Sequence, residues 1–145
     1  MIYLRYAIVF LGVALGAALL IAVLNTQTDT VLGSSAQLMV PAMIAALIEG
    51  QRHARQHKAR AGTGWIWNFT WVATLIAVAL NVALAYGAAS IVPEFGKLAI
   101  APPLGQQFLV LLGLYAGGYL ICNRLFFGIG QGNQLALMRS RGEIE

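Results

Sequence analysis

Charged side chains are scarce in this sequence. Aspartate, glutamate, lysine and arginine make up 10% of the 145 residues, whereas 59% of the residues are hydrophobic. A soluble domain usually carries about 25% charged residues. One soluble core of this size cannot bury so much apolar surface, so the composition indicates a membrane protein. The length predicts one domain.

Groups that could perform chemistry inside a membrane are also scarce. The only cysteine, Cys122, excludes an internal disulfide and cannot by itself form a cysteine-based metal or iron–sulfur site. His53 and His57 lie outside the apolar runs, so we expect no haem held by buried histidines. No set of acids, bases or nucleophiles falls inside an apolar run. We therefore expect no enzyme activity and no cofactor.

Four apolar runs predict an all-α, polytopic membrane protein with four transmembrane helices, forming a single domain over residues 1–145. The first run, Tyr6 to Leu24, has 19 uncharged residues, close to the roughly 20 that a spanning helix needs. It is long for a signal peptide and lacks a good cleavage site, so we expect an uncleaved helix. The predicted helices comprise about residues 3–24, 34–61, 65–92 and 106–127, followed by a short surface segment at 133–141.

The second apolar run, Leu38 to Ile48, is too short to span a membrane alone and contains Pro41. Either a helix begins near Ser34 or Ser35 with Pro41 in its early turns, or a longer helix kinks at this proline. We favour the first interpretation, with the helix ending near Gly62 or Gly64. In the last part of the chain we interpret the segment Gly128–Gly132 as a flexible exit from the bilayer.

The positions of the basic residues predict the orientation. Lys97 alone falls on one side, and eight of the nine basic residues fall on the other: Arg5, Arg52, Arg55, Lys58, Arg60, Arg124, Arg139 and Arg141. Lysine and arginine are enriched on the cytoplasmic side of a membrane. We therefore expect both termini in the cytoplasm and localisation to a bacterial inner membrane.

The segment between the second and third runs has two possible binding roles. Glu49, His53 and His57 are spaced by four residues and would share one helix face, where they could bind a divalent metal. The competing interpretation, which we favour, is a solvated helix end. A second set of residues could dock on anionic lipid headgroups or on an acidic partner, or only determine topology: Arg52, Arg55, Lys58 and Arg60.

Glu49 is the only acidic residue close to the membrane from the cytoplasmic side. It could pair with Arg5 or Arg124 from a neighbouring helix, or remain solvated, and the sequence slightly favours solvation. Among the interior polar residues, Asn81 lies near the middle of the third run, where an unpaired amide is costly. We expect Asn81 to form a hydrogen bond with another helix.

Glycine pairs predict where helices meet. Gly12 and Gly16, and likewise Gly113 and Gly117, are spaced by four residues, a pattern that allows close approach of two membrane helices. We expect these pairs to pack within the helix bundle, and the alternative is contact with another chain.

The stretch VPAMIAALIEGQRHARQHKAR (Val40 to Arg60) and the hydrophobic layout of nearly the whole chain resemble a known family. This is the ABZJ-type family of small bacterial four-helix membrane proteins. The family has no established activity, so the resemblance implies no catalytic residue.

These patterns favour a non-catalytic role. We expect an accessory subunit, or an assembly or stability factor, of a larger bacterial membrane complex, in contact with lipids and with other membrane subunits but not with nucleic acid. The alternative is a small homo-oligomeric transporter or channel, with Asn81 and Glu49 as candidate lining residues.

Overall fold

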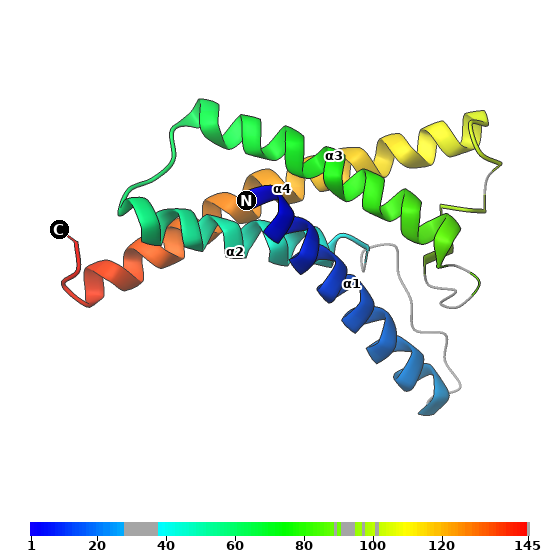
Figure 1. Cartoon of the computed structure of the whole chain (residues 1–145), viewed down its shortest axis with the longest axis horizontal. Helices are drawn as coiled ribbons and strands as arrows, with labels where there is room; N and C mark the ends of the chain where they lie inside the picture. The colour runs from blue at the N-terminus through cyan, green and yellow to red at the C-terminus, as the bar shows by residue number, and fades with distance from the viewer. Residues whose placement is uncertain (28–37, 89, 91–94, 97, 101, 145) are drawn as a thin grey trace.

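A computed structural model describes residues 1–27, 38–88, 90, 95–96, 98–100 and 102–144. This part of the chain is helical, as the sequence predicts. Its four helices are α1 (Ile2–Gln27), α2 (Val40–His57), α3 (Thr63–Gly87) and α4 (Gln106–Ser140) (Figure 1). Three of them, α1, α3 and α4, are long and apolar enough to cross a membrane. These helices support the prediction of a membrane protein.

Helix α2 spans Val40–His57, whereas the sequence predicts a helix over residues 34–61. It begins at Val40 with Pro41 in its first turn, where the missing N–H of proline is tolerated. Pro41 thus lies in the early turns of a helix, as predicted, whereas the predicted start near Ser34 or Ser35 lies outside the described residues. The helix ends at His57 because Lys58 adopts a left-handed conformation with φ 51°, while its N–H donates to the carbonyl of Ala54. Residues 34–37 of the predicted helix lie outside the described residues.

Helix α4 is continuous from Gln106 to Ser140. The predicted exit at Gly128–Gly132, with a separate segment at 133–141, is therefore wrong. The low helix propensity of these glycines is overridden by packing against α2. At 1.5 Å per residue the 35 residues of α4 reach about 50 Å, against about 30 Å for the hydrocarbon core.

Helix α3 ends at Gly87, several residues before the predicted boundary at residue 92, which lies outside the described part. Two side chains that follow it, Phe95 and Leu98, are buried in the hydrophobic core. These two side chains therefore extend the core beyond the end of α3.

The closest helix contact joins α2 and α4 through two glycines. A Cβ atom on Gly50 would collide with the carbonyl of Phe127, and one on Gly130 would collide with the carbonyl of Leu47. Because both positions lack a side chain, the two backbones touch directly. Membrane helices gain dispersion contacts from such close approach.

The two glycine pairs that the sequence predicts as helix contacts do not take part in the contact between α2 and α4. A Cβ atom on Gly12, Gly16, Gly113 or Gly117 would meet no atom within 4 Å. The expectation that these pairs pack inside the bundle is therefore wrong for the described residues. The helix pattern alone does not say which face of a helix meets its neighbour, and here both pairs face outward.

We expect Gly50→Ala to lower the free energy of unfolding of the detergent-solubilised protein by about 1–3 kcal/mol, because a backbone carbonyl cannot move aside like a side chain. Gly117→Ala is the matched control. Its added methyl group meets open space and should change stability by less than about 1 kcal/mol, in the favourable direction. Thermal unfolding followed by tryptophan fluorescence measures both. Equal stability of the two variants would contradict the glycine contact.

Candidate functional site at the basic end of the helices

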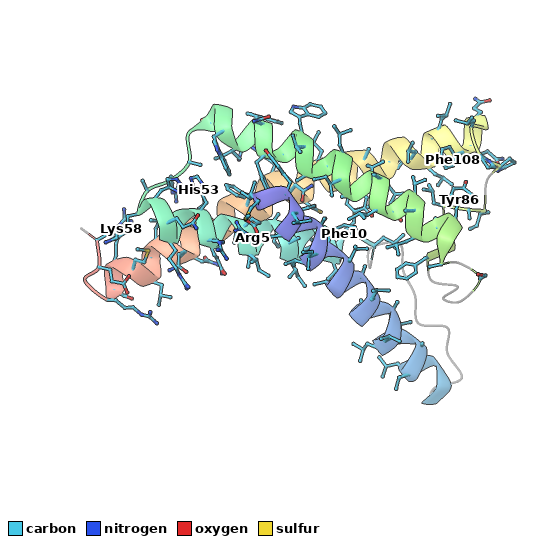
Figure 2. The ribbon with its side chains drawn as sticks, viewed as in Figure 1. Arg5, Phe10, His53, Lys58, Tyr86 and Phe108 are labelled. Carbon is cyan, nitrogen blue, oxygen red and sulfur yellow. The ribbon has the colours of Figure 1, made fainter. Side chains whose placement is uncertain are left out.

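An ion pair joins the beginning of α1 to the middle of α2. Arg5 donates from Nε to Oε1 of Glu49 and from Nη2 to Oε2, both over 3.1 Å. The Glu49 side chain is 2% exposed and the Arg5 side chain 33% exposed. Two parallel bonds of this kind give a guanidinium–carboxylate pair a defined geometry. Figure 2 shows Arg5 between the two helices.

This pair decides between the alternatives for Glu49. The residue is buried and paired with Arg5, so the expectation of a solvated carboxylate is wrong. The metal-binding alternative also loses support. Both carboxylate oxygens face Arg5, and the described residues contain no group of three histidine, cysteine or acidic side chains placed to hold a metal ion.

A polar network beside this ion pair, beginning at the next residue of α1, connects three helices. The hydroxyl of Tyr6 donates to Oδ1 of Asn123 over 2.7 Å, and Nδ2 of Asn123 donates to the hydroxyl of Thr74 over 3.2 Å. All three residues are buried. The network therefore fixes the beginning of α1 against α3 and α4 at a depth where an unpaired polar group is costly.

His53 belongs to an aromatic cluster at the end of α2. Its ring lies 4.2 Å from that of His57 and 4.4 Å from that of Trp65, measured between centroids. Phe69 and Phe127 extend the cluster toward the core, with centroids 4.6 Å apart. Burial lowers the pKa of His53 below its ordinary value of about 6.5, and the positive charge of His57 lowers this pKa further.

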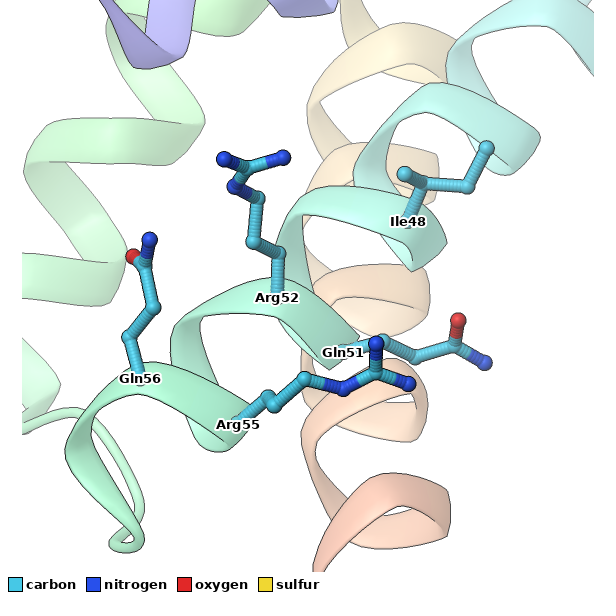
Figure 3. A pocket seen from close by; sticks show the side chains of 5 residues that line it. All are labelled: Ile48, Gln51, Arg52, Arg55 and Gln56. Carbon is cyan, nitrogen blue, oxygen red and sulfur yellow. The ribbon is translucent and has the colours of Figure 1, made fainter.

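The outward side of α2 carries a polar cavity of about 400 Å³ (Figure 3). Its walls are Ile48, Gln51, Arg52, Arg55 and Gln56. Arg55 also donates from Nη2 to Oε1 of Gln134 on α4 over 3.5 Å, a long contact. The cavity thus combines two guanidinium groups and two amides, a set of donors suited to an anion.

The other predicted basic residues do not line this cavity. Lys58 is exposed at the end of α2, and the Arg60 guanidinium lies beside Gly132 of α4. Arg124 lies over the ring of Trp67, with Cζ 5.4 Å from the centroid, a cation–π contact. Of the four residues predicted as a docking surface, the structure brings together Arg52 and Arg55 in one cavity. Lys97 lies outside the described residues.

Asn81 is buried in α3, as its sequence position suggests, but its Nδ2 has no hydrogen-bond partner among the described residues. The expected bond to another helix is therefore absent from that part of the chain. The Tyr119 hydroxyl and Nε2 of Gln131 are buried and unpartnered in the same way.

Comparisons with protein-family models, with curated proteins and with solved structures found no match. The geometry and charge of the described residues are therefore the basis for assigning a role. They place the Arg5–Glu49 ion pair, the network of Tyr6, Asn123 and Thr74, and an anion-suited cavity around the basic ends of the helices.

Removing one partner of the ion pair should be more harmful than removing both. We expect Arg5→Met to lower the melting temperature by several degrees, because it leaves the buried Glu49 carboxylate uncompensated. Glu49→Gln should cost less, since the partly exposed Arg5 can turn to water. The double variant should melt above Arg5→Met alone, which a double-mutant cycle measures. Additive effects would contradict the coupling.

The lowered pKa of His53 predicts loss of stability in acid. The folded protein binds fewer protons at His53 than the unfolded chain does, so this stability is present above about pH 6.5 and lost as the pH falls. We expect the melting temperature to fall between pH 7.5 and 5.5, and to fall less in His53→Phe. A pH dependence that is unchanged in His53→Phe would contradict this assignment.

Proposed function

We propose that this protein is a non-catalytic accessory subunit, or an assembly or stability factor, of a larger complex in a bacterial inner membrane. The observation that carries the proposal is the open glycine face of α1. Gly12 and Gly16 face away from the rest of the described chain, and both could accept the close approach of a helix from another protein.

The surroundings of these glycines fit a helix-docking surface. Toward its C-terminal end α1 leads away from α3 and α4 (Figure 1). Large apolar side chains flank the glycines on the same outward side, and all of them are exposed: Leu4, Ile8, Leu15, Leu19 and Leu20. A groove between such side chains, with glycine at its floor, is the surface that paired membrane helices use.

The proposal includes four membrane crossings with both termini in the cytoplasm. Tyr3 and Phe69 lie near the beginnings of α1 and α3, and their ring centroids are 6.3 Å apart. Phe127, in the second half of α4, lies against Phe69. Helices α1 and α3 therefore run in one direction and α4 in the other. In the proposed topology the segment that contains α2 would return the chain between them, and the excess of basic residues supports a cytoplasmic assignment for that end.

A second candidate, a homo-oligomeric transporter or channel, is favoured by one observation, the buried and unpartnered amide of Asn81. A neighbouring chain or a permeating species could satisfy this group. Glu49 no longer supports this alternative because Arg5 neutralises it. Membership of the ABZJ-type family remains part of the proposal and adds no catalytic residue.

To test the accessory role, the tagged protein would be extracted from its native membrane in a mild, lipid-preserving detergent. Co-purified proteins would then be identified by mass spectrometry. We expect a larger complex in fixed stoichiometry. The double variant Gly12→Leu, Gly16→Leu should lose at least nine-tenths of it, because leucine fills the groove that the partner helix would occupy.

The matched control is Gly113→Leu, Gly117→Leu, which alters two equally open glycines on α4 and should retain the complex. A protein that purifies alone, or equal losses in both variants, would overturn the proposal. A lone homo-oligomer would direct attention to transport. Flux into liposomes that Asn81→Ala reduces would then support the second candidate.

A further inference from the structure

We propose that the outward face of α2 is a binding site for one anionic phospholipid. The phosphate of the lipid would lie in the cavity beside Arg52 and Arg55, and an acyl chain would follow the apolar residues that precede the cavity. This inference concerns α2 and does not depend on the partner that α1 binds.

The cavity has the chemistry that a phosphodiester needs. Arg52 and Arg55 supply two cations with several N–H donors each, and the amides of Gln51 and Gln56 add neutral donors on either side (Figure 3). The long contact of Arg55 with Gln134 places its guanidinium between α2 and α4.

No carboxylate competes for these arginines among the described residues. Glu49 is the nearest acid in the sequence, but it faces α1, is 2% exposed, and has both oxygens occupied by Arg5. The one other acid in an ion pair of the described part, Glu143, pairs with Arg141 near the C-terminus. The cavity therefore keeps its positive charge.

The apolar half of the same face selects a lipid over a soluble anion. Val40, Ile44 and Ile48 are exposed by 36–38% and are spaced by four residues, so they form one stripe along α2. Ile48 also lines the cavity, which joins the stripe to the arginines. A stripe of about 12 Å that ends at two guanidinium groups matches an acyl chain followed by its phosphate. An acidic peptide would leave this stripe uncovered.

The test uses the full chain, purified in a neutral detergent and titrated with dioleoyl phosphatidylglycerol or dioleoyl phosphatidylcholine. Binding is measured as an upward shift in melting temperature that saturates. We expect saturation with phosphatidylglycerol and little shift with phosphatidylcholine. The variant Arg52→Gln, Arg55→Gln should weaken phosphatidylglycerol binding about thirtyfold, since each cation near an anionic lipid contributes a factor of a little over about five in affinity and the two factors multiply.

The charge-matched control is Lys58→Gln, Arg60→Gln, which removes two cations outside the cavity and should weaken binding less than about threefold. Equal weakening in both double variants would overturn the site in favour of diffuse charge attraction. A second arm replaces Ile44 and Ile48 by asparagine, which should weaken binding of the lipid about tenfold. If inorganic phosphate produced the same shift as the lipid, or if the asparagine variant bound normally, the ligand would be a soluble anion and the proposal would fail.

Discussion

The direct backbone contact between α2 and α4 is the constraint on which the remaining structure depends. Gly50 and Gly130 allow the two helices to meet without side chains between them. Successive helix residues are about 100° apart around the axis. With Gly50 held against α4, the preceding residue Glu49 faces α1, where it meets Arg5, and Ile48 faces outward. One contact thus assigns a different role to each of three consecutive residues.

The same constraint separates two kinds of positive charge. Arg5 balances the buried Glu49 and contributes to folding, and Arg124 is engaged by the ring of Trp67. Arg52 and Arg55 lie on the side of α2 that faces away from these partners. A count of basic residues predicts an orientation in the membrane, but it cannot distinguish cations already used inside the chain from those available to a ligand. Packing makes that distinction.

The membrane class, the helical architecture and the place of Pro41 in the early turns of a helix could be predicted from sequence, because hydropathy and proline chemistry act locally. The continuity of α4 could not, since glycine lowers helix propensity and only contact with α2 offsets that loss. The pairing of Glu49 and the network of Tyr6, Asn123 and Thr74 depend on how separate helices rotate relative to one another. The sequence carries one signal for this network, because Tyr6 begins the first apolar run and Asn123 interrupts the last one. For the contact of Gly50 with Gly130 it carries no signal beyond the residue type.

The length of α4 has a mechanical consequence. The helix is about 20 Å longer than the hydrocarbon core is thick, and among its 35 residues there is no break at which the part in lipid could bend independently of the part beyond it. Over its last turns it is braced by α2. A force on the C-terminal turns would therefore be carried along the unbroken helix to its opposite end near Gln106.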